Sequence, residues 1–370
     1  MDRKVIVLGG PLMIKMINKY LGRGEFSITV PPMDGALMPN ELLEESEKLL
    51  IADAPDCLAM MNGVPVVSSR SKVLEADTGG KEVARFDAEI SCLAGLPNGG
   101  LAVGLMDGRI AIANGTNNGK IIKPIGGAKC PTAMHADFDN NLFVTHGSST
   151  NSYNEWKKDL MEKNSSGSLW RVEIATGKQT KICGGLAFPY GIYHDGKTLI
   201  VAESWRSRLL KIFLDGSKPP EEVLGHLPGY VSRMAPAQKD GIWLTVFAPR
   251  SQLVEFVLRE KRYRKLMMEM IDPAYWLAPT LRSNKSHYES LQAGGVKVLG
   301  ILKPWAPARS YGLVIRLDSN FQPVASLHSR ADGSRHGITS CIEHNGRLLM
   351  AVKGDGMVAS YPMDRIKKES

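Results

Sequence analysis

FPYGIYHDGKTLIVAESWRSRLLKIFLDG, at residues 188–216, is the stretch that decides the fold, because its pattern recurs along the chain. A few apolar residues lead into an Asp-Gly turn, and an alternating strand, a polar turn and another strand follow. Five further copies begin near residues 54, 88, 131, 230 and 337. Such self-similarity at short intervals is typical of an architecture built from repeated units.

Each copy contains a dipeptide that favours a tight reversal between two strands. Asn-Gly and Asp-Gly supply the positive φ angles that two-residue hairpins need. These pairs stand at residues 62–63, 98–99, 195–196, 240–241 and 345–346, and Asp139-Asn140 takes the same place in the third copy. Each copy therefore predicts a small antiparallel sheet.

Six such sheets have to bury their apolar faces against one another. Packing them face to face around an axis predicts an all-β chain with the fold of a six-bladed β-propeller over residues 51–370. A β-sandwich with regularly spaced hairpins is the alternative, but the same pattern at the same place in every unit favours radial repetition.

Three segments interrupt or precede the repeat. We expect residues 1–50 to form a partly helical N-terminal extension, with a short helix at 40–50 (NELLEESEKLL) that buries one leucine face. A polar, partly helical insertion is expected at 148–168, and a longer one at 259–310 contains a helix within 272–291. Insertions of this length on a rigid scaffold either cover a site or cap one end of the fold.

Composition excludes several classes of protein. The 370 residues are 43% hydrophobic and 23% charged, and no apolar run approaches the roughly 20 residues of a transmembrane helix. The net charge of +8 comes from scattered basic residues without interleaved aromatics, which argues against nucleic-acid binding. The five widely spaced cysteines show no zinc-binding pattern and fit a reducing compartment, so we expect a cytoplasmic protein, with the periplasm as the alternative.

Residues 185–216, followed by LPGY at 227–230, resemble the signature stretch of the strictosidine-synthase-like proteins. These proteins lie within the senescence-marker/gluconolactonase and paraoxonase group of six-bladed propellers. Residues 310–352 are similar to the closing blade of the same group, and the resemblance covers most of the chain after residue 50. It implies either a calcium-dependent lactonase or arylesterase, or a metal-free condensation of an amine with an aldehyde.

The resemblance implies an axial calcium ion in the metal-dependent members. Aligned on the repeats, Asp56 takes the place of the first-blade acid, Tyr190 that of an asparagine, and Ser232 that of an aspartate, with Arg233 beside it; Thr132 is the third-blade equivalent. A phenol and a hydroxyl are weak calcium ligands, and a guanidinium repels the ion. We therefore expect no calcium site of this type and no other cofactor.

Two further points follow from the same alignment. A metal site displaced from the family's calcium position, with Asp56 and Glu89 as its ligands, remains an open alternative. The catalytic glutamate of the condensing branch falls on Thr339, which cannot perform that proton transfer near neutral pH, so strictosidine synthase activity is not expected.

The first residues of the innermost strands should meet at the propeller axis. There we expect Glu89 or His336 as a general base, Asp56 as the orienting group, and Tyr190 and Arg233 as the groups that hold an oxyanion. The other expected substrate-binding residues are Ser232, Thr132, His146 and Thr339. Any one of these residues could serve structure alone, whereas their convergence favours a binding site.

The resulting hypothesis is a small-molecule hydrolase of the lactonase or esterase type that works without the usual calcium ligands. Two alternatives stay open. One is a metal-free lyase, isomerase or cyclase that uses the same pocket, and the other is a non-catalytic propeller that binds a small ligand.

Overall fold

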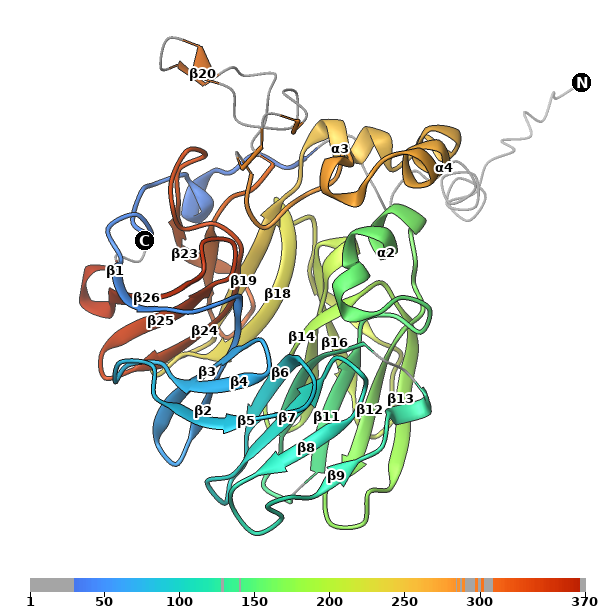
Figure 1. The fold of residues 1–370 in the computed structure, drawn as a ribbon, viewed down its shortest axis with the longest axis vertical. Helices are drawn as coiled ribbons and strands as arrows, with labels where there is room; N and C mark the ends of the chain where they lie inside the picture. The colour runs from blue at the N-terminus through green and yellow to red at the C-terminus, as the bar shows by residue number, and fades with distance from the viewer. Residues whose placement is uncertain are drawn as a thin grey trace, which may run out of the picture.

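Six four-stranded antiparallel sheets surround a common axis in the computed structural model (Figure 1). The structure describes residues 30–366 except 128–129, 140, 284, 287, 290–296, 299–300 and 303–308. Residues 1–29 of the expected N-terminal extension, and Asn140 of the turn expected in the third copy, lie outside the described residues. The prediction of a six-bladed β-propeller is confirmed.

Each blade runs from an innermost strand at the axis to an outermost strand. The first three blades are β2 (Pro55–Met61), β3 (Val64–Ser69), β4 (Lys72–Glu75) and β5 (Glu82–Arg85); β6 (Ile90–Gly95), β7 (Leu101–Leu105), β8 (Ile110–Ala113) and β9 (Ile121–Ile122); and β10 (Pro131–Ala136), β11 (Asn141–His146), β12 (Gly167–Glu173) and β13 (Gln179–Leu186). The other three are β14 (Pro189–His194), β15 (Thr198–Glu203), β16 (Arg208–Phe213) and β17 (Glu221–Leu224); β18 (Gly229–Pro236), β19 (Ile242–Pro249), β22 (Leu313–Leu317) and β23 (Pro323–His328); and β24 (Ile338–His344), β25 (Arg347–Val352), β26 (Met357–Pro362) and β1 (Glu47–Ile51).

The five Asn-Gly and Asp-Gly pairs lie where the sequence places them. Each joins the first and second strands of its blade. At Asn62-Gly63 both φ angles are positive, at 50° and 76°, and at Asn345-Gly346 they are 48° and 70°. Positive φ at both central residues is the mark of the type I′ hairpin, whose twist matches that of the strands it connects.

The expected helix at residues 40–50 is wrong. Its second half is strand β1, which pairs antiparallel with β26 and so becomes the outermost strand of the sixth blade. Leu43 is buried, and Leu49 and Leu50 pack against the sixth and first blades. The leucines of this segment are buried or partly buried, as expected. They lie on or next to strand β1, which covers the open edge of β26. This pairing places a strand from the start of the chain in the last blade and so closes the propeller.

The fifth blade is completed later in the chain than the repeat suggested. After the first two strands of the copy that begins near residue 230, residues 252–257 form helix α3 (Gln252–Val257), and the third and fourth strands of the blade are β22 and β23. The stretch at 310–352 is therefore shared between the fifth and sixth blades. An insertion at residues 250–312 lies between β19 and β22, and it includes α4 (Lys261–Met270), the 3-10 helix η5 (Pro273–Tyr275) and the short strands β20 (Lys297–Val298) and β21 (Ile301–Leu302).

The first insertion forms between β11 and β12 as expected. It contains the 3-10 helix η3 (Tyr153–Glu155) and α2 (Trp156–Glu162). Helices α2, α3 and α4 all lie at the same end of the propeller, the upper end in Figure 1. The remaining 3-10 helices are η1 (Gly35–Leu37), η2 (Ile125–Gly127), η4 (Ser204–Arg206) and η6 (Met363–Arg365).

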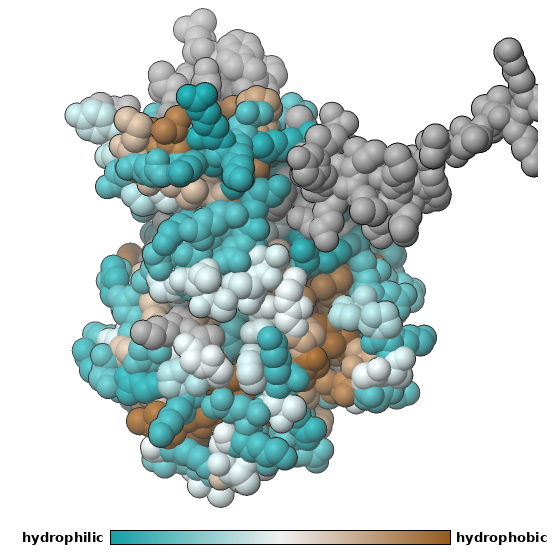
Figure 2. Space-filling view, turned by 90° about the vertical axis from the view of Figure 1, so that its right-hand side faces the viewer, coloured by the Kyte–Doolittle hydropathy of each residue, from teal (hydrophilic) through white to brown (hydrophobic). Residues whose placement is uncertain are grey.

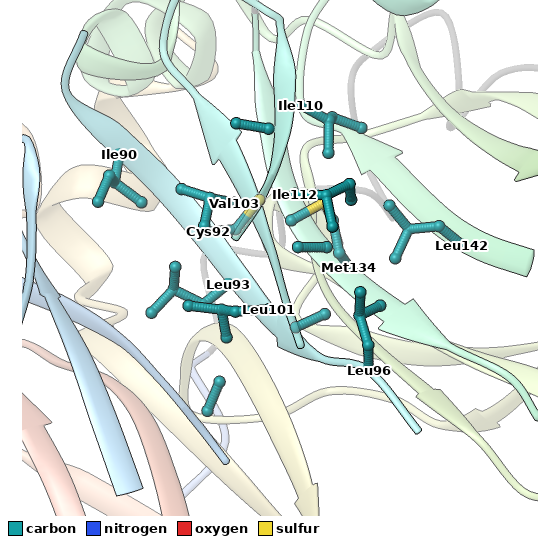
Figure 3. Close-up of a cluster of buried hydrophobic side chains, with 14 of the residues drawn as sticks. Ile90, Cys92, Leu93, Leu96, Leu101, Val103, Ile110, Ile112, Met134 and Leu142 are labelled. Atoms are coloured by element: carbon teal, nitrogen blue, oxygen red, sulfur yellow. The ribbon is translucent and has the colours of Figure 1, made fainter. Parts of the chain in front are cut away.

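The blades hold together through apolar side chains between neighbouring sheets. Figure 3 shows Met134 and Leu142 of the third blade beside Val103 and Ile112 of the second, all of them in one buried cluster. The face in Figure 2 is mostly hydrophilic, with small hydrophobic areas. Within the described residues, the helices are too short or too polar to cross a membrane. All five cysteines are free thiols.

Candidate functional site

A register shift near the start of each innermost strand brings one or two side chains to the axis. In five blades the pairing with the second strand slips after the first paired residue, as at Pro55 and Pro131. Such a bulge re-aims a side chain without breaking the sheet. The buried residues at these shifts are Asp56, Ser91, Thr132, Tyr190 and Thr339, together with Ser232 and Arg233 of the fifth blade.

Arg233 ties these strands together from the axis. Its Nη2 atom donates hydrogen bonds to the carbonyl oxygens of Ser91 (2.6 Å) and Thr132 (3.0 Å). Its Nη1 atom donates to the carbonyl oxygens of Asp56 (3.2 Å) and Thr339 (3.4 Å), and also to Asp56 Oδ1 (2.8 Å). One guanidinium therefore joins five of the six blades, its own included.

Among the described residues, Asp56 is the only acidic residue whose carboxylate contacts this guanidinium. The same carboxylate accepts hydrogen bonds from two further donors. Asp56 Oδ2 accepts hydrogen bonds from the Tyr153 hydroxyl (2.5 Å) and from Lys353 Nζ (2.6 Å). Burial alone would raise the pKa of Asp56, but the positive charges of Lys353 and Arg233 outweigh burial and hold that pKa far below its usual value. Asp56 is consequently ionised at neutral pH and is a weak base while both cations contact it.

Two tyrosines extend this network away from the axis. Because the Tyr153 hydroxyl gives its proton to Asp56, the Tyr190 hydroxyl, 2.7 Å away, donates to the Tyr153 oxygen. Burial raises the pKa of both phenols, so both are neutral at physiological pH. Gly191, directly after Tyr190, permits this arrangement, since a Cβ there would lie 2.2 Å from the carbonyl oxygen of Ser232.

The first insertion supplies Tyr153 and is itself anchored through Asp159 of α2. This fully buried carboxylate accepts hydrogen bonds from Trp205 Nε1 (2.7 Å), Asn151 Nδ2 (3.0 Å) and Asn164 Nδ2 (2.8 Å). Buried carboxylates are stable only when their lone pairs are satisfied. Asp159 thus fixes α2 and η3 over the fourth blade, which places Tyr153 above Asp56.

An aromatic cavity of about 140 Å³ lies on this covered side of the axial network. Its lining residues are Tyr153, Asn154, Trp156, Phe188, Tyr190, Phe247, Leu281 and Lys353. A groove of about 410 Å³ next to α2 and η5 shares Asn154, Trp156 and Leu281 with the cavity, so the two spaces adjoin. The aromatic cavity has apolar walls and a floor of one ammonium and two hydroxyl groups.

A second cavity, of about 320 Å³, lies along the opposite part of the axis. It is lined by residues of all six innermost strands, among them Cys57, His135, Cys341 and Arg233. The guanidinium of Arg233 therefore separates two cavities.

Of the sequence-predicted residues, Asp56, Thr132, Tyr190, Ser232, Arg233 and Thr339 meet at the axis. The hydroxyl groups of three of them contact the protein itself: that of Thr132 approaches the carbonyl oxygen of Pro189, that of Ser232 bonds to Thr245 Oγ1 (2.7 Å), and that of Thr339 donates to Asp56 O (2.7 Å). Their substrate-binding roles remain predictions.

Glu89 does not reach the axis. Its partly exposed side chain accepts a hydrogen bond from Arg70 (3.0 Å), which also pairs with Asp53 on the surface. Ser91, two residues further on, takes the axial position of the second blade because β6 begins at Ile90. The predicted axial position of Glu89 is therefore wrong, and its roles as general base and metal ligand lose the geometry on which they rested.

The two predicted histidines lie outside the aromatic cavity. His336 is buried before β24, where Nδ1 is 2.7 Å from Ser310 Oγ and Nε2 is 2.7 Å from the Arg330 carbonyl oxygen. That carbonyl needs the Nε2 proton and Ser310 donates to Nδ1, so neither nitrogen is free to act as a base. His146 ends β11, one strand away from the axis, and neither of its ring nitrogens has a hydrogen-bond partner among the described residues.

Sequence reasoning missed Lys353 and most of the aromatic walls. Lys353 directly follows β25, in the turn before β26, while Tyr153 and Trp156 come from the first insertion. From the sequence, the polar turns between the second and third strands of each blade indicate only boundaries between strands. These turns lie at the same end of the propeller as the insertions. A lysine in such a turn of the sixth blade was therefore the feature of the sequence that could have pointed to Lys353.

Comparisons with known proteins agree with this architecture. A scan of protein-family models found no match. The chain is 27% identical over 190 residues to the Arabidopsis thaliana protein named strictosidine synthase-like 13, and the match covers 47% of this chain and 47% of that relative, about half the length of each. The resemblance seen in the sequence is confirmed.

Solved structures share the fold at low identity. A gluconolactonase from Xanthomonas campestris has a TM-score of 0.53 at 13% identity, covering 92% of this chain and 95% of that one. A luciferin-regenerating enzyme has a TM-score of 0.52 at 13% identity, covering 89% of this chain and 96% of its own. At this identity the likeness shows the fold, and activity has to be argued from the site.

The axial residues do not fit the calcium ion that the resemblance implies. The guanidinium of Arg233 already fills the space between Asp56 and the carbonyl oxygens of the inner strands. Within the described residues, moreover, three or more His, Cys, Asp or Glu side chains do not gather anywhere as a metal-binding group. The cation on the axis is therefore the Arg233 side chain, in the place where the resemblance implies a calcium ion.

Replacing Arg233 with methionine should destabilise the fold strongly. Arg233→Met leaves several buried carbonyl oxygens without a donor and removes one of the two cations on Asp56, at a cost of about 3–5 kcal/mol. Urea unfolding, followed by tryptophan fluorescence, measures this change. Arg85→Met is the matched control, because Arg85 forms an ion pair with Glu82 on the surface (2.8 Å), and unchanged stability in both variants would contradict the account.

His146 should make stability depend on pH. Burial lowers the pKa of His146 to about 4, whereas an unfolded histidine titrates near 6.5. As pH falls from about 6.5 to 4, the unfolded chain gains a proton that the folded chain refuses, so roughly 3 kcal/mol of stability is lost. His146→Leu should flatten this part of the stability–pH curve, and an identical slope in both proteins would contradict the prediction.

Proposed function

We propose that the protein is a metal-independent hydrolase of small lactones or esters that acts in the aromatic cavity. The observation that carries the proposal is the position of Lys353 and Tyr190, whose ammonium and hydroxyl groups form the polar floor of a cavity with aromatic walls. Such a floor offers two hydrogen-bond donors between aromatic walls, where a donor stabilises developing negative charge more strongly than it does in bulk water. The shared fold with a gluconolactonase supports the same class.

The chain's own groups suit the first step of such a reaction. Trp156 and Phe247, 5.4 Å apart in an edge-to-face arrangement, offer a surface for a flat substrate. The substrate carbonyl oxygen would then accept a hydrogen bond from Lys353, and the oxyanion formed by attack of water would gain more from that contact than the carbonyl does. Tyr190 would turn its hydroxyl from Tyr153 to the same oxygen.

Asp56 is the proposed general base. When Lys353 turns toward the substrate, Asp56 loses one of the two cations that hold its pKa down, so Oδ2 gains affinity for a proton. The carboxylate can then take the proton of the attacking water as the new carbon–oxygen bond forms. The same proton passes to the leaving alkoxide when the ester bond breaks, which restores the ionised carboxylate.

A non-catalytic binding propeller is the second candidate. It is favoured by the contacts of Asp56, both of whose oxygens are already bound by donors. In that case the aromatic cavity holds a ligand and the carboxylate serves structure alone.

A panel of lactones and aryl esters, assayed with and without a chelator, tests the proposal. We expect turnover that is insensitive to chelation and that falls about 10²–10³-fold in Lys353→Met, because an oxyanion donor is lost. Tyr190→Phe should be impaired in the same direction, and Glu89→Gln, outside the cavity, should equal the wild type. Loss of activity on chelation, or a larger loss in Glu89→Gln than in Lys353→Met, would contradict it, and ligand binding without turnover would establish the second candidate.

A further inference from the structure

The axial network has one more cation than anion. Arg233 and Lys353 both contact Asp56, and a second carboxylate does not join them among the described contacts. The neighbouring phenols of Tyr153 and Tyr190 are neutral because burial raises the pKa of both. Arg233 is buried and Lys353 is half-buried, and charges removed from water that share one counterion are incompletely compensated, so this site gains free energy when an anion enters.

Lys353 is the cation that a ligand in the aromatic cavity can reach. Arg233 lines the opposite cavity, whereas Lys353 lines the aromatic cavity and its side chain is 16% exposed. An ammonium group has three N–H donors. In the described part of the chain, Lys353 Nζ makes one hydrogen bond, to Asp56 Oδ2, and otherwise lies 5.1 Å from the centre of the Tyr153 ring.

The size and walls of the cavity restrict what can accompany the anionic group. An apolar protein cavity of about 150 Å³ accommodates benzene. The aromatic cavity measures about 140 Å³, and Trp156, Phe188, Tyr190 and Phe247 supply most of its walls. One six-membered ring therefore fits, and a larger ring system would have to extend into the adjoining groove.

The adjoining groove also favours an anion. Lys157 lines it, and burial lowers the pKa of Lys157 to about 8, so the side chain is mostly charged at pH 7. The Nζ atom of Lys157 donates a hydrogen bond to the backbone oxygen of Pro273 (3.5 Å). Glu155, the acidic residue that lines the groove, is paired with Lys158 (3.4 Å). Beyond the lining, Arg309 and Glu289 form an ion pair (3.7 Å) that acts on Lys157, and Asp272 also attracts its charge. The groove thus leads past one cation toward another.

We infer that the aromatic cavity selects a single-ring carboxylate, with the carboxylate at Lys353 and the ring among the aromatic walls. This inference rests on the cavity of the proposed function and not on turnover. For the proposed hydrolase it names the acyl half of the substrate, since hydrolysis of an ester of an aromatic acid releases such a carboxylate beside Lys353. The acid should then also act as a competitive inhibitor.

Calorimetric titration of the full chain with three single-ring probes tests the inference. Benzoate, benzamide and benzylammonium present the same ring with a negative, a neutral and a positive substituent. We expect benzoate to bind at least 10-fold more tightly than benzamide, and benzylammonium not to bind measurably. Equal affinity for benzoate and benzamide, or tighter binding of benzylammonium, would overturn the inference, as would the absence of binding by all three.

Variants identify the group responsible. Lys353→Met should abolish the preference for benzoate over benzamide, while benzamide binding persists. Lys353→Arg keeps the positive charge and should retain the preference. The arginine variant also provides a test if the methionine variant fails to fold. Lys72→Met is the control, because Lys72 forms a surface ion pair with Glu82 on the first blade. A preference for benzoate that survives in Lys353→Met would refute the role of Lys353.

The outcomes also separate this inference from the proposed hydrolase activity. Selective benzoate binding without turnover of any ester would support the inference and contradict the hydrolase. Hydrolysis of esters without a preference for benzoate would do the reverse.

Discussion

The buried contact between Arg233 and Asp56 is the interaction on which the structure of the axis depends. A propeller brings six strand starts to one place, and the backbone carbonyls there need donors that neighbouring strands cannot supply. Here one guanidinium donates to four of these carbonyls and to the Asp56 carboxylate. The planar, permanently charged guanidinium suits this task because it offers five donors in a fixed geometry.

This contact also sets the chemistry available above it. With Arg233 on one oxygen and Lys353 on the other, Asp56 stays ionised, and of the two cations it is the lysine that lines the aromatic cavity. The cation that contacts Asp56 on the axis is a side chain of the protein itself. The first insertion completes the arrangement by bringing Tyr153 onto Asp56 and Trp156 into the cavity wall.

Much of the fold and part of the site could be predicted from the sequence. Asn-Gly and Asp-Gly pairs mark strand reversals because few other dipeptides adopt positive φ angles, so the six blades were found. The axial residues followed from the repeat, but the second blade was misaligned by two residues, since nothing in AEISC shows whether the strand begins at Glu89 or at Ile90. The leucines at 42–50 fit a helical face as well as a strand, and only the open edge of β26 decides between them. Lys353 was missed because the contact it makes with Asp56 spans 297 positions of the chain.

Chemical rescue tests the central claim, that the guanidinium of Arg233 is the axial cation, most directly. The thermal midpoint of Arg233→Ala is to be measured with millimolar guanidinium, with calcium, and with sodium as the ionic control. The account predicts that guanidinium raises the midpoint of the variant but not that of the wild type, and that calcium leaves the wild type unchanged. A wild type stabilised by calcium, or a variant as stable as the wild type without any addition, would contradict it.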